Sequence, residues 1–545
     1  MTGPTRRAAL AGGLAAALAG PPALARSASR ATLRVRDDLP GRAISPLVYG
    51  SNEIGAMEGG ALSADLDRAA GVAFRRLGGN LMTTYDWASN ASNAGKDWRH
   101  ANLLFLPDAL RMEGERRSEP FSVIDVMHRA SLAMGAKSLV TLPLAGYVAA
   151  DADGDVAPAD AAPSRRFKPV RWDGRTPAGA PIDPAVCDVP HLLAKLLERY
   201  GDAGSADGIF GYSLDNEPGL WPETHPRVVR ANPTVAALIE RSIAAARAVK
   251  ALDPKAQVFG PASWGATEFA TFQDAPDWSA FRRYGSFLAA YLDAFRRASE
   301  EAGVRLIDAL DVHWYPYSRA GDLLHAKDPA LGPALLDAPR SLSESGFRER
   351  SWVTDVLGVD DAADAAVTLP LLPSLERIVA RWFPGVRVAV TEFNYGAGVL
   401  PAAGLALADA LGRLGAGGVW CASHWGALSG ALGEAYRLYR ATDGAGGAFG
   451  DAALGLEGAG PGLAAYAARS GEGGPVRIVL INKAETPTVV DIAFARAERT
   501  ALAGLGFDAG RAVGPVERLP ERIDGGGRIE LPPRSARRFA FGESR

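Results

Sequence analysis

The 545-residue chain contains little cysteine, with Cys187 and Cys421 as its only two. Two cysteines cannot form a disulfide framework, and their separation is not the spacing of a metal-binding motif. Cys421 lies in an apolar, strand-like run, so we expect it to be a small buried residue. The sequence leaves open whether the two cysteines form a single bridge.

The chain also lacks an excess of charge of either sign. Its 59 Lys and Arg residues nearly balance its 62 Asp and Glu residues, for a formal net charge of -3, and no long basic run occurs. This balance argues against nucleic acid or an acidic membrane surface as the main partner. Hydrophobic residues make up 48% and charged residues 22%, as in ordinary soluble globular proteins. The length exceeds what one core supports, so we expect two domains.

Beyond its amino terminus, the chain has no hydrophobic run long enough to span a bilayer. At the amino terminus, Arg6 and Arg7 precede an Ala/Leu/Gly-rich run from Ala8 to Leu18, and Ala23-Leu24-Ala25 is a small-x-small cleavage sequence. We predict an export signal over residues 1–25. The paired arginines favour the twin-arginine type, and an unstructured Ala-rich tail is the alternative. The mature protein is then expected to be a monomer in the periplasm or outside the cell, without a membrane contact after export.

Residues 46–430 repeat a short apolar run, a loop and an amphipathic helix. This alternation predicts an α/β fold, a (β/α)₈ TIM barrel with long loops. A doubly wound open sheet is the competing fold, but no Gly-rich phosphate-binding turn follows the first strand. The eight predicted strands are Leu47–Gly50, Ala73–Leu77, Ser138–Leu142, Gly208–Leu214, Gln257–Gly260, Ile307–Val312, Val386–Val390 and Gly418–Ala422.

The predicted helices have clearer boundaries than the strands. Pro190 begins one helix, which Gly201 ends. Asn232 and Pro233 are the expected cap and first turn of the next. Three later helices are predicted over Phe287–Ala294, Leu375–Phe383 and Leu405–Leu414.

Past about Gly430 the helix signals fade, and Gly and Pro separate short alternating runs. We predict a smaller C-terminal antiparallel β-sandwich over residues 431–545. Ala31–Val35 also alternates like a strand. Because chain ends often meet at domain surfaces, we expect residues 26–45 to join the sandwich. The sandwich strands are predicted at Val476–Leu480, Val489–Phe494, Arg528–Leu531 and Arg538–Phe541.

Two glutamates follow predicted barrel strands. The sequence GYSLDNEPGLW leaves Asn216 and Glu217 at the carboxyl end of the fourth strand, and TEFNYG offers Glu392 at the end of the seventh. The carboxyl ends of barrel strands are where active sites form. A pair of carboxylates is what glycosidic bond hydrolysis requires. We therefore predict a retaining glycosidase, with Glu217 as acid/base and Glu392 as nucleophile, and this chemistry requires no cofactor.

Other polar and aromatic residues near strand ends are candidates for binding substrate. Arg76 is expected to keep one carboxylate charged, and Asn216 to bond a sugar 2-hydroxyl. His313 and Tyr315 are interpreted as orienting the nucleophile, and Trp425 as a platform for a sugar ring. A strand-end aromatic or histidine can also be ordinary scaffold. The full predicted substrate-binding set is Arg76, Asn80, Trp87, Asn216, His313, Trp314, Tyr315 and Trp425.

Two loops carry weaker signals. The sequence DADGD places Asp151, Asp153 and Asp155 around a glycine, a pattern that can bind a structural calcium ion through oxygen ligands. A solvated acidic turn is the alternative, since the full EF-hand loop is missing. The loop from Tyr315 to Leu369 is long for a connection within a domain, so we expect a wall or lid.

Several segments in order along the chain resemble glycoside hydrolase family 44. The resemblance implies a barrel plus a β-sandwich, and retaining endo-hydrolysis of β-1,4-glucans of the plant cell wall, such as carboxymethyl cellulose and xyloglucan. By motif position it puts the acid/base on Glu217 and the nucleophile on Glu392. Phe393 stands where the family motif would have Tyr, which leaves the preferred polymer open. The segments are Arg75–Trp98, Gly146–Gly154, Gly211–Arg227, Asp311–Pro316, Ala338–Trp352 and Val390–Gly396.

Other functions remain open at this point. Another retaining glycosidase of the same barrel clan, such as a xylanase or an arabinofuranosidase, would use the same two glutamates. A non-catalytic polysaccharide-binding protein would not need both glutamates intact. A metal-dependent hydrolase lacks a visible His/Asp ligand cluster.

Overall fold

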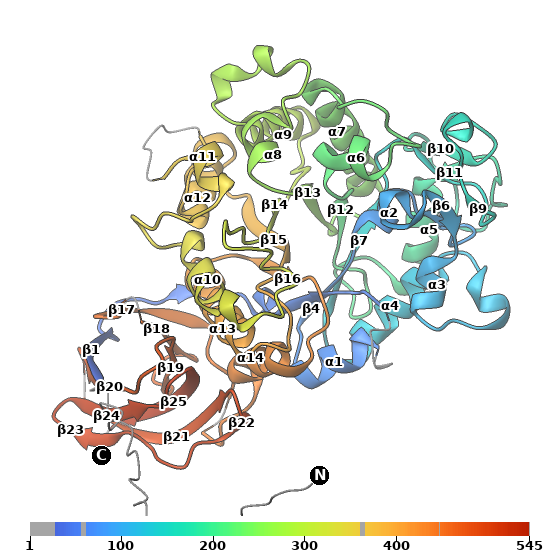
Figure 1. Cartoon of the computed structure of the whole chain (residues 1–545). Coiled ribbons are helices and arrows are strands. Elements are labelled where there is room, and N and C mark those ends of the chain that lie inside the picture. Colours follow the sequence, from blue (N-terminus) through green and yellow to red (C-terminus); the bar gives the residue numbers. More distant parts are fainter. Residues whose placement is uncertain are drawn as a thin grey trace, which may run out of the picture.

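Eight parallel strands close into a barrel, as predicted (Figure 1). The computed structural model describes residues 28–55, 62–359, 366–445, 447–460, 462–496 and 498–543, so the predicted export signal lies outside the described residues. In barrel order, the strands are β3 (Gly50–Asn52), β4 (Phe74–Leu77), β7 (Lys137–Leu142), β12 (Gly211–Leu214), β13 (Gln257–Ser263), β14 (Ala309–Trp314), β15 (Arg387–Phe393) and β16 (Cys421–His424).

The first strand starts later than predicted. Pro46–Val48 form a 3-10 turn, capped by the Ser45 hydroxyl, which accepts from the Leu47 N–H. The proline fixes φ for this turn, so the chain becomes extended only at Gly50. A side chain at Gly50 would not fit, since its Cβ would lie 2.3 Å from the Ala422 carbonyl oxygen.

Four other strands run past their predicted carboxyl ends. β13 continues to Ser263, β14 to Trp314, β15 to Phe393 and β16 to His424. The apolar pattern stops earlier because polar residues, such as Ser263, His313 and Glu392, interrupt it before the strands end. His313 and Glu392 therefore lie within strands, where the backbone fixes their positions.

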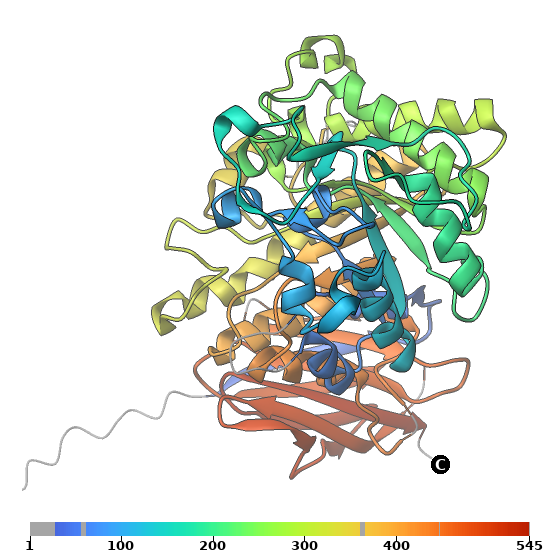
Figure 2. The same ribbon diagram turned by 90° about the vertical axis from the view of Figure 1, so that its right-hand side faces the viewer.

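A helix follows each barrel strand and covers the outside of the barrel (Figures 1 and 2). These helices are α1 (Ser63–Ala70), α4 (Ser122–Ala133), α5 (Val189–Tyr200), α7 (Val235–Leu252), α9 (Phe287–Ala302), α12 (Leu371–Trp382), α13 (Pro401–Ala416) and α14 (Gly430–Arg440). Shorter helices in the loops are α2 (Asn80–Thr83), α3 (Phe105–Ala109), α6 (Trp221–Thr224), α8 (Ala266–Thr271), α10 (Gly332–Asp337) and α11 (Trp352–Leu357).

Two helix predictions need correction. The cap of α7 is Thr234, whose hydroxyl accepts from the Ala237 N–H at 3.1 Å, and not Asn232. Helical structure also continues past Gly430, because α14 packs its buried Leu432, Tyr436 and Tyr439 against the barrel. Glycines in this segment weaken its helical signal, so the apolar stripe could not be recognised from the sequence.

The second domain is built on one continuous 11-stranded sheet that folds over on itself. Its two layers enclose a separate apolar core that includes Leu33, Ile478, Ile492 and Phe541. The sheet order is β22 (Arg511–Pro515), β21 (Arg499–Asp508), β25 (Ser535–Glu543), β19 (Val476–Asn482), β18 (Leu463–Arg469), β17 (Ala452–Glu457), β1 (Ser29–Arg36), β20 (Thr488–Phe494), β24 (Gly526–Leu531) and β23 (Glu521–Ile523), with β2 (Arg42–Ala43) beside β17.

The amino-terminal strand joins this sheet, as expected. β1 runs antiparallel to β17 and parallel to β20. The sandwich is therefore not wholly antiparallel, because β1 enters it from the other end of the chain. The fold class, a barrel with a sandwich, is confirmed.

Insertions and contacts complete the architecture. Two small sheets flank the barrel mouth, one of β5 (Ser92–Asn93), β6 (Ala101–Leu103) and β9 (Gly154–Asp155), the other of β8 (Tyr147–Ala149), β10 (Phe167–Arg171) and β11 (Cys187–Asp188). Cys187 and Cys421 are both free and buried. Lys483 of the sandwich donates to the Leu336 carbonyl at 2.7 Å and pairs with Asp409 of α13, which joins the two domains. Among the described residues, no helix is both long and apolar enough to cross a membrane.

Candidate active site

Glu217 sits on a strained turn after β12. Asp215 and Glu217 both have left-handed backbones, with φ of 68° and 47°. For a residue with a side chain this conformation costs about 1–3 kcal/mol, and it persists only where surrounding contacts enforce it. Here the Glu217 N–H donates to the Ala262 carbonyl at 3.0 Å. The buried Asp215 carboxylate accepts from Thr83 Oγ1 and from the Asn216 N–H, both at 2.7 Å.

Glu392 is held by a buried cation and a phenol. Arg76 Nη1 donates to Glu392 Oε1 at 2.7 Å, and Tyr315 donates to Oε2 at 2.7 Å. The Arg76 guanidinium also donates to Asn52 Oδ1 at 3.1 Å and to Asn216 Oδ1 at 2.8 Å. Burial raises the pKa of Tyr315 well above its usual value, so its phenol stays a donor. Charge-assisted bonds of this kind are short and directional, so they fix the position of the carboxylate.

A bulge in β15 aims Glu392 into the barrel mouth. Paired with β14, the register moves from Val312 opposite Val390 to His313 opposite Glu392, which leaves Thr391 as an extra residue. A bulge of this kind redirects side chains. Thr391 Oγ1 donates to the buried Asp311 at 2.9 Å, and the next residue, Glu392, faces the cleft.

The two glutamates meet across the barrel mouth. A carboxylate oxygen of Glu217, a ring nitrogen of His313 and a carboxylate oxygen of Glu392 all lie within 4.8 Å of one another. His313 Nδ1 is 2.8 Å from Glu217 Oε1 but 3.5 Å from Glu392 Oε2. The prediction that His313 and Tyr315 both orient Glu392 is therefore wrong in part, because His313 lies closer to Glu217.

The two glutamates have different electrostatic surroundings. Burial raises the pKa of Glu217 to about 7, a shift that the nearby Arg76 opposes and Asp97 adds to. Burial lowers the pKa of His313 to about 3, so the imidazole is neutral. Glu217 thus has no direct cationic partner here, whereas Glu392 is bonded to a guanidinium. Glu217 can therefore keep a proton near neutral pH.

A cleft of about 1060 Å³ lies over both glutamates. Its walls include the predicted Asn80, Asn216, Tyr315 and Trp425. The first part of the long loop after β14 contributes residues 315–318 and 321–325, which fits the expected wall. The remaining lining residues are Gly79, Asp97, Leu220, Glu223, Thr224, Trp264, Thr267 and Gln273.

Residues 91–318 match the sequence profile of glycoside hydrolase family 44. Over 448 residues, or 80% of this chain, the sequence is 36% identical to endoglucanase A of Paenibacillus lautus. The fold superposes on Cel44A, a family 44 endoglucanase from Clostridium thermocellum, with a TM-score of 0.85 and 34% identity, over 94% of this chain and 100% of that one. The chain belongs to glycoside hydrolase family 44.

A further family 44 structure is a xyloglucanase from Paenibacillus polymyxa, solved with xyloglucan. It superposes with a TM-score of 0.84 and 32% identity, over 95% of this chain and 100% of that one. The resemblance seen in the sequence is thus confirmed. The chain spans 61% of the length of the Paenibacillus lautus endoglucanase.

Trp87 and Trp314, which were predicted to bind substrate, lie outside the cleft over the two glutamates. Trp87 is 2% exposed, and its Nε1 donates to the Asp188 carbonyl at 3.1 Å. Trp314 is also 2% exposed and stacks on Phe269. Strand side chains alternate between faces, so on β14 His313 faces the site and Trp314 faces the surrounding helices. Neither indole can stack on a sugar from these positions.

Cleft residues that the sequence did not predict include Trp264, which follows β13, and Asp97, beside Asn80. Trp264 could have been found by the strand-end rule if β13 had been predicted to run to Ser263. Asp97 Oδ2 accepts from Asn80 Nδ2 at 2.9 Å. No local pattern marks Asp97, because its role depends on the fold of a loop.

The calcium prediction is not supported by the contacts of DADGD. Asp151 is paired with Arg166 at 2.7 Å, and Asp155 with Arg99 at 2.5 Å. Arginines therefore already neutralise two of the three carboxylates. In the described part of the chain, the three-residue cluster with metal-ligand geometry is Glu217, His313 and Glu392. A divalent cation there would have to share Glu392 with the Arg76 guanidinium, which opposes it by charge.

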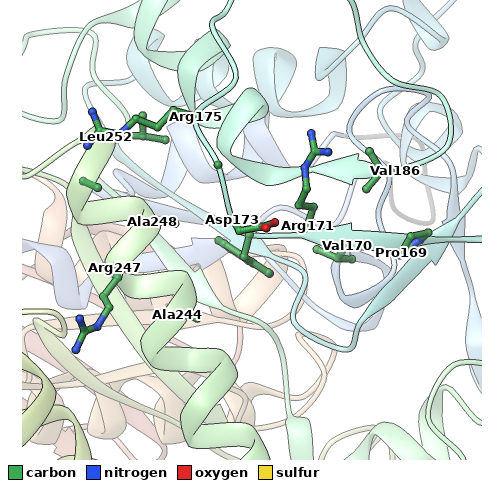
Figure 3. A pocket seen from close by; sticks show the side chains of 13 residues that line it. Pro169, Val170, Arg171, Asp173, Arg175, Val186, Ala244, Arg247, Ala248 and Leu252 are labelled. Atoms are coloured by element: carbon green, nitrogen blue, oxygen red, sulfur yellow. The ribbon is translucent and has the colours of Figure 1, made fainter.

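A second hollow, of about 780 Å³, lies away from the glutamates (Figure 3). Ala244 and Ala248 on α7 form one side of it, and Val170 and Arg171 of β10 the other. Its lining is mostly apolar and contains neither glutamate. The paired carboxylates therefore lie in the other cleft, and not in this hollow.

Proposed function

We propose that the protein is a retaining, endo-acting glycoside hydrolase that cleaves β-1,4-glucan backbones of plant cell walls. The observation that supports the retaining part of this proposal is the close approach of the glutamates, with one oxygen of each carboxylate within 4.8 Å of the other. Retaining enzymes hold their carboxyl groups about 5–5.5 Å apart, whereas inverting enzymes need about 6.5–9.5 Å to admit a water. The short separation supports direct attack by one carboxylate on the sugar.

In the proposed mechanism, Glu217 is the acid/base and Glu392 the nucleophile. Glu392 Oε attacks C1 of the sugar as the bond from C1 to the glycosidic oxygen breaks, and Glu217 gives its proton to that oxygen. Glu217 then takes a proton from a water whose oxygen attacks C1 and releases Glu392. The pKa of Glu217, raised to about 7, and the ion pair of Glu392 with Arg76 support this division of roles.

The other cleft residues act on geometry and binding. Arg76 and Tyr315 each donate to one carboxylate oxygen of Glu392 and so fix its direction. Asn216, anchored through its Oδ1 to Arg76, offers its amide group toward a sugar 2-hydroxyl. Trp425 and Asn80 line the cleft, where an indole face stacks on a pyranose and an amide bonds its hydroxyls.

We propose xyloglucan and unbranched β-1,4-glucan as the substrates. The structural relative from Paenibacillus polymyxa is a xyloglucanase and that from Clostridium thermocellum an endoglucanase. The test is a screen of xyloglucan, carboxymethyl cellulose, lichenan, glucomannan and xylan, with product sizes followed in time. Early mixed-length products from xyloglucan or carboxymethyl cellulose are expected. Release of single sugars from chain ends, or cleavage of xylan alone, would contradict the proposal.

The product anomer tests retention separately. NMR of the first products should show the β-anomer before mutarotation, and α-product would contradict the nucleophile assignment. Full activity in a chelator is expected, and its loss would favour a metal-dependent reaction at Glu217, His313 and Glu392. A protein that binds xyloglucan but never cleaves it would instead be a polysaccharide-binding protein.

We also propose that the protein is exported, with residues 1–25 removed, and acts as a monomer. Cell fractionation and amino-terminal sequencing of the mature protein test this. Replacing Arg6 and Arg7 by lysine should retain the protein in the cytoplasm if export uses the twin-arginine route. Size-exclusion chromatography with light scattering should give the mass of one chain.

A further inference from the structure

A third glutamate, Glu268, lies buried near Glu217. Glu268 belongs to α8, and its side chain is fully buried. Its Oε1 lies 3.0 Å from Ser263 Oγ, and its Oε2 accepts from the Trp264 N–H at 3.2 Å. The Gly219 N–H also donates to this carboxyl. Gly219 is packed so closely that a Cβ there would lie 2.8 Å from Glu268 Oε2.

These partners are the two segments that position Glu217. Gly219 belongs to the 3-10 turn Pro218–Leu220, which starts directly after Glu217. Ser263 and Trp264 follow Ala262, whose carbonyl accepts the Glu217 N–H and whose own φ is 54°. Glu268 therefore ties together both backbones that impose the left-handed conformation on Glu217. Without that tie, the strained turn has fewer contacts to enforce it.

The charge state of Glu268 suits this place. Burial raises its pKa to about 8, and the nearby Glu217 raises it further in the same direction. The carboxyl is thus mostly neutral at neutral pH. Its Oε1 accepts from the Ser263 hydroxyl and its Oε2 accepts from the Trp264 N–H. A neutral group here adds no negative charge near a residue that must release and recover a proton.

We propose that Glu268 is a positioning residue for the proton donor: as a neutral hydrogen-bonding hub it holds the turn that aims Glu217 at the glycosidic oxygen. This inference rests on the proposed function, since it assumes that Glu217 protonates the leaving group. It assigns to α8 a role that is separate from substrate binding. Glu268 itself touches neither substrate nor the reacting atoms.

The test compares substrates that differ in their need for protonation. A sugar leaving group in the polysaccharide needs the acid, whereas dinitrophenolate in 2,4-dinitrophenyl β-cellotrioside leaves without it. Glu268→Ala should lower kcat/KM on the polysaccharide by about 30- to 100-fold, the scale of a misplaced catalytic group. On the dinitrophenyl glycoside the loss should stay below about threefold, because attack by Glu392 is unaffected.

Two further variants test whether the loss of rate is specific to the hydrogen bonds of Glu268. Glu268→Gln keeps the same shape, accepts from the backbone through its oxygen and donates to Ser263 through its amide, so it should recover most of the lost rate. Asp308→Ala is a matched control at the amino end of β14. Asp308 is another buried carboxylate, bonded to Lys250 Nζ and to the Val258 N–H, both at 2.8 Å. Asp308→Ala should lower Tm, but it should not lower kcat/KM on the polysaccharide more than on the dinitrophenyl glycoside.

Glu217→Ala separates the two proposals. It should lose the polysaccharide reaction while keeping kcat/KM on the dinitrophenyl glycoside. If it loses both equally, the acid role of Glu217 is wrong. If Glu217→Ala behaves as expected but Glu268→Ala loses both reactions equally, or loses neither, the role of Glu268 alone is refuted. A loss in Glu268→Gln as large as in Glu268→Ala would likewise refute the neutral hub.

Discussion

The same strands form both ends of the barrel interior, but the side chains are apolar at one end and polar at the other. At the amino end, the side chains of Phe74, Leu139, Phe259, Ala309, Ala389 and Cys421 form a closed apolar layer. Phe259 stacks on Trp420 with ring centroids 5.3 Å apart. At the carboxyl end the same strands present Arg76, Asp311, His313 and Glu392. Arg76 pairs there with Glu392, and Asp311 accepts from Thr391.

A step of two residues along a strand separates the layers. Phe74 and Arg76 are neighbours on one face of β4, and Ala309, Asp311 and His313 follow each other on β14. The apolar layer gains free energy by burial. The polar layer buries charges, which is costly unless they are paired. The comparison therefore predicts that the amino end determines stability and the carboxyl end determines rate, and the variants below test each half.

The largest effect is expected at the proposed nucleophile. Glu392→Ala should lower kcat on the order of 10⁵-fold, the scale seen when a covalent nucleophile is removed. Azide fits the space left by the side chain, so it should restore part of the rate on an activated aryl glycoside and give a glycosyl azide of inverted configuration. NMR of that product is the measurement. Activity of Glu392→Ala near that of the wild type would end the assignment.

Removing the proposed acid, Glu217, should have the next largest effect. Glu217→Gln should lower kcat/KM on polysaccharide by about 10²–10⁴-fold while substrate affinity is kept. In the wild type, the protonated acid is lost as pH rises, so kcat/KM should fall above about pH 7, the pKa to which burial raises Glu217. The variant's remaining rate should lack this alkaline fall. A pH profile unchanged by the substitution would contradict the acid role.

The amino-end layer should respond in stability and not in rate. Phe259 is fully buried, and Phe259→Ala should cost about 3–5 kcal/mol of unfolding free energy. Its kcat/KM below the unfolding temperature should stay within about twofold, because its ring partners Phe74, Phe210 and Trp420 do not line the cleft. Denaturant unfolding and kinetics on the same sample make the comparison. A large rate loss would show that the two layers are coupled.

Glu217 should itself reduce stability at high pH. Below its ordinary pKa of 4.5, the carboxyl is protonated in both folded and unfolded chains, so it contributes no difference. Between 4.5 and about 7 the unfolded chain releases the proton first, so folding stability falls as pH rises. Glu217→Gln should remove this loss and be more stable by up to about 3 kcal/mol above pH 7. Equal stability of both proteins across this range would contradict the raised pKa.

The smallest effect is expected for one hydrogen bond to Glu392. Tyr315→Phe removes the donor to Oε2 but leaves Arg76 in place, so kcat should fall about tenfold, as for one bond to a charged group. Folding stability should change little. Arg76→Ala is the stronger comparison, because it leaves Glu392 without its cation, and a smaller loss there than in Tyr315→Phe would reverse our order of importance.

Much of the barrel could be predicted because hydrophobic residues recur at a different spacing in its strands than in its helices. The strand ends could not, since apolar runs stop where polar site residues begin, as at Ser263, His313 and Glu392. Trp314 was misassigned because one residue of register decides whether a strand side chain faces the cleft or the helices. Trp87 was misassigned because burial in a loop leaves no local pattern.

Long-range partners explain the remaining differences. DADGD resembles a cation loop until Arg166 and Arg99 are folded against it. Glu268 lies in the short helix ATEFAT, where a glutamate is expected to face water, and only the fold places it near Glu217. The two glutamates themselves were predictable because a local motif identifies each of them and strand order brings them to the same barrel mouth.

The place of β1 in the sandwich affects how the chain can be divided. This strand, residues 29–36, lies between β17 and β20, which come more than four hundred residues later. Most of the chain must therefore be synthesised before β1 can pair with β17 and β20. A fragment starting at β17 would have two open edges inside its sheet, which invite aggregation. To obtain this domain in isolation, residues 29–36 would have to be joined directly to the segment that begins at β17.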